Sequence, residues 1–326
     1  MTLINPAGDQ HEFRVSVVIP VYNAAAFVTR AVESALEQPE TAEVLLVEDG
    51  SPDNALEICR NLADKHEKVR LHRHPNGENR GAGASRNMGM KNCLNEFIAF
   101  LDADDFFLPG RFTATRKVFE DNKYCDGVYE AAGVVIEDEA GLRNWEQAGR
   151  SINHLYTMNG QFIPEELTLA LLNSGENGYF HLDGLTLRKN ILERSGFMNE
   201  ALRLHQDTEF IIRVTCVARL MPGNLEKPVA MVRVHHQNRI TSPRSQGQKY
   251  KNQMAYWKSL YDWSKNNCQK DIQIKILLSI ISFTRNHKYF RNFPRQIFPT
   301  SLIIASRYFR LLAYPGLILD FLSRPG

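Results

Sequence analysis

The sequence predicts an α/β fold with a doubly wound, mostly parallel sheet of the Rossmann-like, nucleotide-binding kind and a C-terminal helical extension. Short apolar runs alternate with helical patterns over the first hundred residues, at residues 15–19, 44–47 and 97–101. The runs are continuous, which is typical of strands buried on both faces of a parallel sheet. Each run ends in polar or turn-forming residues, where such sheets bind their ligands.

The first elements follow in regular order. Residues 15–19 are mostly β-branched, and we expect Pro20 to end this strand. Residues 24–38 carry apolar side chains at helical spacing, and residues 44–47 form the next strand. Asp53 is expected to cap the helix that follows. The pattern thus begins as strand, helix, strand, helix.

The remaining elements repeat this order and then become mixed. We expect a weaker strand at residues 69–72, a helix at 84–94 and a strand at 97–101. Farther on, residues 134–136 read as a strand and residues 208–219 as a helix. A polar, turn-prone stretch near residue 242 is the best domain boundary.

Composition excludes several classes of protein. The 326 residues carry a formal charge of +2, with 43% hydrophobic and 23% charged residues, which indicates a globular protein rather than a nucleic-acid binder. Five cysteines without a Cys-x-x-Cys pair give neither a zinc pattern nor a disulfide framework. We find no signal peptide and no run long enough for a transmembrane helix, so we expect a cytoplasmic protein.

The charge is unevenly distributed. Residues 1–239 have a net charge of −9 and residues 240–326 one of +11. The basic part contains an amphipathic stretch at residues 272–290 and an aromatic, arginine-containing one at residues 297–322. Such helices pack on the rest of the chain, pair in a homodimer, or make peripheral contact with the inner face of the cytoplasmic membrane.

Three carboxylates, those of Asp102, Asp104 and Asp105, crowd directly after the strand expected at residues 97–101. Residues i and i+2 of an extended chain point to one side, so Asp102 and Asp104 can converge on one object. Carboxylate oxygens suit Mg²⁺ or Mn²⁺, which take phosphate oxygens as further ligands. The alternative is that these acids only cap the following helix.

Polar residues at the other strand ends accompany this acidic loop. Tyr22 and Asn23 follow the first strand, where an aromatic ring can pack on a base or ribose. Glu48 and Asp49 precede the tight turn at Gly50, and an anionic side chain there can accept the imide N–H of uracil.

The small-residue segment at residues 79–87 opens the third helix and lets a ligand approach the backbone. Arg86 within it can meet a phosphate or a base. The segment lacks the third glycine of a dinucleotide fingerprint, which disfavours a nicotinamide oxidoreductase.

Four motifs, P-x-Y-N, E-D-G-S, N-x-G-x-x-x-x-R-N and D-A-D-D, occur in this order. Their set resembles the family 2 inverting glycosyltransferases of the GT-A fold, over roughly residues 15–242. The resemblance implies a GT-A domain at residues 1–242, with a nucleotide-sugar half at about 1–124 and an acceptor half at about 125–242. Residues 243–326 then form the helical, basic and aromatic extension.

The resemblance also implies roles for individual residues. Asp49 would contact the uracil ring, and Glu48 stands where many members have Asp. Arg86 resembles the arginine that helps to hold the nucleotide. Asp104 and His235 resemble the ligands of a divalent metal, Mn²⁺ or Mg²⁺, with Asp102 and Asp105 as further candidates. The implied nucleotide-sugar-binding residues are Pro20, Tyr22, Asn23, Glu48, Asp49, Asn79, Arg86, Asp102, Ala103 and Asp104.

Asp207 resembles the catalytic base of the family, after a G-F-x-x-E segment at residues 196–200. Members commonly have Glu-Asp where this chain has Gln206 and Asp207. His181 and Asp183 lie in the expected acceptor region, and we count them and Gln206 as acceptor-side candidates.

The sequence thus predicts a metal-dependent, inverting glycosyltransferase that moves a sugar from a UDP-sugar to a saccharide or lipid-linked saccharide, in cell-surface polysaccharide or lipopolysaccharide biosynthesis. Gln206 keeps open a non-catalytic homologue that only binds the nucleotide-sugar, as a subunit. A sugar-nucleotide pyrophosphorylase is the other alternative, but its glycine-rich, lysine-containing loop is absent after the first strand.

Overall fold

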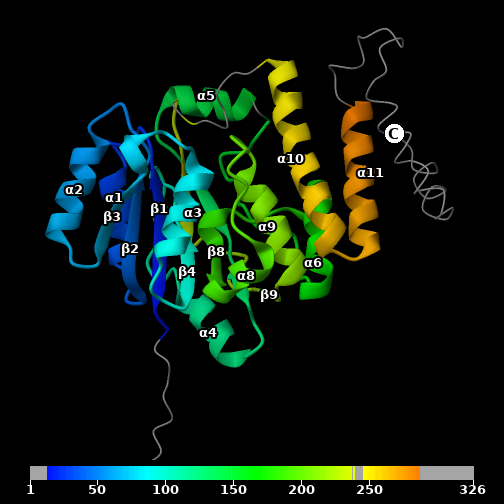
Figure 1. Ribbon diagram of the computed structural model, residues 1–326, viewed down its shortest axis with the longest axis horizontal. Coiled ribbons are helices and arrows are strands. Elements are labelled where there is room, and N and C mark those ends of the chain that lie inside the picture. The colour runs from blue at the N-terminus through cyan, green and yellow to red at the C-terminus, as the bar shows by residue number, and fades with distance from the viewer. Residues whose placement is uncertain (1–12, 148, 237, 239–244, 287–326) are drawn as a thin grey trace, which may run out of the picture. The chain divides into compact units, whose positions relative to one another are not determined.

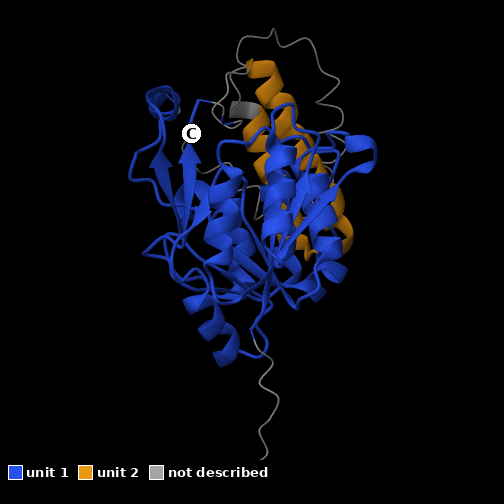
Figure 2. Ribbon diagram, turned by 90° about the vertical axis from the view of Figure 1, so that its left-hand side faces the viewer, with its two compact units in different colours: residues 1–243 blue, residues 244–326 orange. Residues whose placement is uncertain are grey.

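The computed structural model describes residues 13–147, 149–236, 238 and 245–286. The chain divides into two compact units, residues 1–243 and residues 244–326 (Figure 2). The basic segment at residues 297–322 and the end of the stretch at 272–290 lie outside the described residues. All predicted site residues belong to the first unit.

The first unit is built on a seven-stranded sheet with the order β3-β2-β1-β4-β8-β6-β9 (Figure 1). Within this sheet only β8 runs against its neighbours, so the sheet is mostly parallel, as predicted. Its strands are β1 (Val15–Val21), β2 (Thr41–Glu48), β3 (Val69–Arg73), β4 (Phe97–Phe100), β6 (Gly127–Tyr129), β8 (Leu185–Arg188) and β9 (Leu220–Pro222).

The chain builds this sheet outward from β1 through β2 to β3 and then returns to place β4 on the other side of β1. The border between β1 and β4 is therefore the point where the strand order reverses. In this class of fold, ligands bind beyond the carboxyl ends of the strands at such a point. Tyr22 and Asp102 follow β1 and β4 at these ends.

Pro20 does not end the first strand, contrary to the sequence prediction. It pairs with Val47 inside β1, and the strand continues to Val21. The O atom of Val18 accepts a hydrogen bond from the N atom of Leu101, so Val18 and Pro20 both face β4. The pairing of β1 with β4 ends at Val18 and Phe100, so the missing amide of Pro20 interrupts no bond of this pairing.

Helices cover both faces of the sheet. Val17 and Ile19 pack with α1 (Val28–Leu36) and α2 (Ala55–Lys65) in one core. On the other face a Cβ at Gly89 of α3 (Ala82–Asn92) would lie 2.3 Å from Val18, so only glycine allows this approach. The ring of Phe210 in α9 (Gln206–Val217) lies 6.2 Å from that of Phe100, which places α9 on the α3 face.

The other helices of this unit are α4 (Thr113–Asp121), α5 (Glu139–Gln147), α6 (Pro164–Leu172), α7 (Ser174–Asn177) and α8 (Leu192–Ser195), with 3-10 turns at Pro75–Gly77, Leu182–Gly184 and Lys189–Ile191. The predicted helix at residues 24–38 is shorter than expected, since α1 begins only at Val28. Asp53 accepts the amide of Ala55 at the start of α2, and also that of Ala25.

A second sheet of three strands brings distant segments together. It has the order β5-β10-β7, with β5 (Phe106–Phe107), β10 (Ala230–Val234) and β7 (Ala132–Ile136). Strand β5 directly follows the acidic loop, and β10 pairs with it antiparallel and leads into His235. This pairing therefore carries His235 to the acidic loop.

The second unit contains α10 (Gln246–Asn267) and α11 (Lys270–Asn286), which lie against each other. The rings of Tyr250 and Phe283 stack between them at 5.6 Å. Ser245 caps α10 by accepting the amide of Gln248. Among the described residues, none of the helices combines the length and the apolar character needed to cross a bilayer.

Candidate active site

Tyr22 and Asn23 follow β1 at its exposed carboxyl end. Tyr22 is 45% exposed, so its ring is open to solvent and to a ligand. Asn23 has a left-handed backbone with φ of 53°, and its amide donates to the hydroxyl of Ser51 at 3.2 Å. The ends of β1 and β2 are thereby tied together, and Tyr22 stands on a fixed turn.

Glu48 is fully buried at the end of β2, and both of its carboxylate oxygens are used within the protein. Oε1 accepts the amide of Ser51 at 2.6 Å, and Oε2 accepts from Nε of Arg73 at 2.7 Å. Burial alone would raise the pKa of Glu48, but the Ser51 amide and Arg73 outweigh it and lower the pKa. Glu48 thus holds the turn, and its contact with a nucleotide stays a prediction.

Asp49 fixes the loop that opens α3. Its carboxylate is buried and accepts the amides of Arg80 and Gly81 at 2.7 and 2.9 Å, while the side chain of Asn79 donates to its carbonyl oxygen at 3.0 Å. Gly81 has φ of 92°, which L residues rarely adopt. The two motifs predicted to bind the nucleoside are therefore joined into one structure.

Arg86 projects from α3 and forms an ion pair with Asp102, the first acid after β4. Its side chain is almost fully buried, yet Nε and one terminal nitrogen have no hydrogen-bond partner among the described residues. Burial opposes the charge, but Asp102 and then Asp207 outweigh it and raise the pKa of Arg86. The charged Arg86 side chain, with two nitrogens that have no hydrogen-bond partner among the described residues, therefore lies near both Asp102 and Asp207.

Asp104 meets His235, as the sequence predicted. Asp104 Oδ2 lies 3.1 Å from His235 Nε2 and 3.3 Å from Nδ2 of Asn238, and about a third of the Asp104 side chain is exposed. Arg233, at the end of β10, donates to the carbonyl oxygen of Asp104 at 2.8 Å and holds the loop in place. Ala103, between the acids, is buried in the core.

Asp105, Asp183 and His181 form a buried group beneath Asp102. Oδ1 of Asp183 accepts the amide of Asp102 at 3.2 Å, so Asp183, predicted to face the acceptor, is instead fully buried and holds the acidic loop. Burial, and then the charges of Asp104 and Asp183, raise the pKa of Asp105 well above its usual range.

His181 lies at the open side of this group. Burial disfavours its charged form, but the carboxylate of Asp183, followed by those of Asp102 and Asp207, outweighs burial and raises the pKa of His181 to about 9. Ligand atoms of Asp102, Asp105 and His181 lie within 4.8 Å of one another. The structure thus brings Asp102 and Asp105, the further metal candidates, together with His181.

Asp207 lies in the first turn of α9, with Oδ1 accepting the amide of Thr208 at 2.8 Å. It is half-buried, and its charge reaches Arg86 and His181. Gln206 beside it is 8% exposed and packs over Gly83, and its Oε1 has no partner among the described residues. The predicted base therefore faces the acidic loop.

Asn87 lies in one of the four motifs, but no role was predicted for it. Its side chain exchanges two hydrogen bonds of 2.9 Å with the backbone of Met198 and donates to Glu200 at 3.0 Å. Arg213 of α9 similarly donates to the carbonyl oxygen of Phe197 at 2.7 Å. The segment at residues 196–200 is thereby held between α3 and α9, which a motif alone does not reveal.

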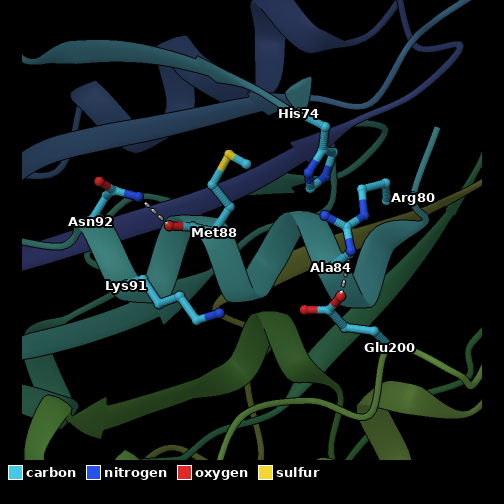
Figure 3. A pocket seen from close by; sticks show the side chains of 7 residues that line it. All are labelled: His74, Arg80, Ala84, Met88, Lys91, Asn92 and Glu200. Carbon is cyan, nitrogen blue, oxygen red and sulfur yellow. Dashed lines mark hydrogen bonds and ion pairs between the residues drawn. The ribbon is translucent and has the colours of Figure 1, made fainter. Parts of the chain in front are cut away.

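A pocket of about 260 Å³ lies along the outer side of α3, away from the predicted catalytic residues (Figure 3). Arg80 and Glu200 form an ion pair of 3.4 Å at one end of it, and Lys91 lies toward the other. The lining residues are His74, Arg80, Ala84, Met88, Lys91, Asn92 and Glu200. The pocket marks where α3 meets the segment at residues 196–200.

Residues 16–170 of the chain match the model of glycosyl transferase family 2. The match covers just under half of the chain, which thus contains a segment similar to this family. The matched segment contains all three strand ends, together with Arg86 and the acidic loop. His181, Asp207 and His235 lie beyond it, so their place in the site rests on the structure and on the motif resemblance.

Known proteins agree with this assignment. The chain is 42% identical over 97 residues to the succinoglycan biosynthesis protein ExoU of Rhizobium meliloti, which covers 30% of the chain and 28% of ExoU. It is 26% identical over 204 residues to the minor teichoic acid biosynthesis protein GgaA of Bacillus subtilis. This match covers 60% of the chain and 42% of GgaA. The chain thus spans less than half the length of these curated relatives.

The solved structure of S. aureus TarS 1–349 in complex with UDP-GlcNAc has a similar fold. The TM-score is 0.64 at 17% sequence identity, and the match covers 87% of this chain and 77% of TarS 1–349. The chain thus has the GT-A fold that its sequence motifs imply.

Proposed function

We propose that this protein transfers a sugar from a UDP-sugar to a hydroxyl group of a saccharide or lipid-linked saccharide, with inversion at the anomeric carbon. The observation that carries the proposal is the position of Arg86, which pairs with Asp102 and lies within reach of the charge of Asp207. One cation thus connects the acidic loop of the donor half with the candidate base on α9.

The donor would bind across the carboxyl ends of β1, β2 and β4. Tyr22 offers an exposed ring for the base, and Asp49 anchors the loop beside it. The unused N–H groups of Arg86 suit the oxygens of a diphosphate, which a guanidinium binds at two points. The TarS complex with UDP-GlcNAc supports a UDP-sugar as donor.

A divalent metal fits Asp104 and His235. Their ligand atoms lie 3.1 Å apart, about the spacing of adjacent ligands around an octahedral ion with bonds of about 2.1 Å. An oxygen and an imidazole nitrogen suit Mn²⁺ in particular, and Mg²⁺ is the alternative. When bound, the ion neutralises negative charge on the diphosphate leaving group. Asp102 and Asp105 are less suitable, because Asp102 pairs with Arg86 and Asp105 accepts the amide of Arg233 at 2.7 Å.

Asp207 would act as the base. A single displacement needs no enzyme nucleophile, only a carboxylate that removes the proton of the acceptor hydroxyl as that oxygen attacks the sugar. The proton passes to Asp207, the new glycosidic bond forms, and UDP leaves from the opposite face of the anomeric carbon. Asp207 is held by the Thr208 amide and faces His181 and Arg86.

The acceptor class follows from the relatives. ExoU and GgaA are named for the biosynthesis of succinoglycan and of a minor teichoic acid, so we propose a growing cell-surface polysaccharide as acceptor. We further propose that the protein works in the cytoplasm. The basic residues 240–326 would contact the anionic inner face of the membrane, and a homodimer through the same helices is the alternative.

The test is product analysis with the full chain, Mn²⁺ and a panel of UDP-sugars. We expect release of UDP, slow with water and faster with acceptor saccharides, and a product with inverted anomeric configuration by NMR. Release of pyrophosphate from a sugar phosphate and UTP would instead indicate a pyrophosphorylase. Binding of UDP-sugar without turnover, with every acceptor tried, would favour a non-catalytic subunit.

A further inference from the structure

Tyr179 is a large side chain with 37% exposure near the acceptor side of the site. It follows Gly178, which has φ of 73°, and precedes Phe180, which is buried and stacked on Tyr129 at 4.7 Å. Because Phe180 fixes the backbone, the exposed position of Tyr179 is built into the fold.

The ring of Tyr179 is held from one side by other aromatic rings. Its centroid lies 5.4 Å from that of Tyr156, edge to face, and 6.4 Å from that of His154. Tyr156 is itself buried and lies 5.3 Å from His181. A rigid aromatic cluster thus supports Tyr179 and connects it with the acidic group of the site.

The aromatic cluster places Tyr179 on the side of the site that holds His181. Tyr156, which contacts Tyr179, also lies 5.3 Å from the ring of His181, and His181 lies beside Asp102 and Asp105 of the acidic loop. Burial is the main reason why the pKa of Tyr179 is raised, and the charge of Asp207 also contributes. A base must lie within hydrogen-bond distance of the hydroxyl that it deprotonates. A ring on this side of the site is therefore placed to contact the acceptor, whereas Tyr22 and Asp104 belong to the donor side.

We propose that the exposed ring of Tyr179 is a platform on which a pyranose ring of the acceptor stacks, so that one hydroxyl of that ring points to Asp207. A pyranose presents C–H groups on its faces and hydroxyls at its rim, which an aromatic ring flanked by polar groups matches. This inference rests on the proposed function and deepens it, since it names the residue that binds the acceptor.

Three variants of the full chain test it. Tyr179→Leu removes the aromatic ring but keeps apolar bulk, and Tyr179→Phe keeps the ring. Tyr124→Leu is the matched control, because Tyr124 is 85% exposed and precedes β6, at the amino ends of the parallel strands, opposite the site. Circular dichroism and thermal melting verify that each variant is folded.

The first readout is kinetic. We expect Tyr179→Leu to raise the acceptor KM about tenfold, which corresponds to about 1.4 kcal/mol, while the donor KM and the hydrolysis of UDP-sugar by water stay unchanged. Tyr179→Phe and Tyr124→Leu should behave like wild type. An acceptor KM for Tyr179→Leu within twofold of Tyr124→Leu would overturn the proposal.

The second readout does not need turnover. Saturation-transfer NMR with methyl β-glucoside, methyl β-galactoside and methyl β-N-acetylglucosaminide should show transfer to the ring C–H protons of at least one sugar, lost only in Tyr179→Leu. Absence of transfer from wild type to all three, or transfer that survives in Tyr179→Leu, would overturn the platform. Sugar binding at Tyr179 without any UDP release would instead retain the platform and refute the transferase.

Discussion

The side-chain amide of Asn87 and the backbone of Met198 bind each other through two hydrogen bonds of 2.9 Å, one in each direction. Asn87 is buried next to Arg86 on α3, and Met198 lies on the segment that leads into α9. This pair therefore fixes the helix that carries Arg86 relative to the helix that carries Asp207.

The first prediction concerns this pair. Asn87→Leu leaves the amide and the carbonyl oxygen of Met198 without partners, so we expect it to lower the free energy of unfolding by about 1–3 kcal/mol per unpaired group and to lower kcat. Urea unfolding and steady-state kinetics measure the two effects. Asn92→Leu is the control, since Asn92 is exposed on the same helix and its side chain donates to the carbonyl oxygen of Met88. Equal stability and kcat for the two variants would refute the linking role.

The second prediction concerns Arg86. Arg86→Lys keeps the charge but removes the two-point geometry, so we expect UDP to bind at least tenfold more weakly in calorimetry. Arg60→Lys, an exposed exchange on α2, should bind UDP like wild type. Unchanged affinity in Arg86→Lys would show that the unused nitrogens do not meet the donor.

The third prediction is the pH dependence of stability that Glu48 causes. Its folded pKa is lowered against an unfolded value of about 4.5, so the unfolded state binds the proton more tightly. The stabilisation is present above pH 4.5 and is lost as the pH falls through the lower, folded pKa. Glu48→Gln should therefore be less stable than wild type at pH 7, with a difference that shrinks below pH 4.5. A constant difference across this range, or the same behaviour in the exposed Glu57→Gln, would contradict it.

The fourth prediction concerns the metal. Removal of divalent ions with EDTA should abolish UDP release, and Mn²⁺ should restore it in wild type. Asp104→Asn should need at least tenfold more Mn²⁺ for half-maximal rate, because it loses the charged ligand. Asp138→Asn is the control, because Asp138 pairs with His236 and not with His235. Full activity in EDTA would remove the metal from the mechanism.

The sequence was most informative where structure is set locally. The apolar runs at residues 15–19 and 97–101 correspond to β1 and β4. Asp104, which follows β4, lies beside His235, the other metal ligand that the motifs implied. Strand ends were less predictable. β1 continues through Pro20 only because β4 stops beside it, which depends on a strand almost eighty residues away.

The same limit applies to the site. Asp183 holds the amide of Asp102, and Tyr179 rests on Tyr156, through contacts that tertiary packing creates and no short motif encodes. Gln206 could be read as a departure from the family pattern, but not as a buried side chain over Gly83. Positions close in the sequence to a strand end were therefore predictable, whereas the places of Asp183, Tyr179 and Gln206 were not.

The central claim is that Asp207 deprotonates the acceptor in a site that holds the donor through Arg86 and Asp104. Its most direct test is the rate of sugar transfer by Asp207→Asn at saturating UDP-sugar, Mn²⁺ and acceptor, with the exposed Asp64→Asn on α2 as control. We predict a loss of about 10²–10⁴-fold in kcat with unchanged donor affinity, and a wild-type rate for the control. Transfer by Asp207→Asn at the wild-type rate would contradict the account.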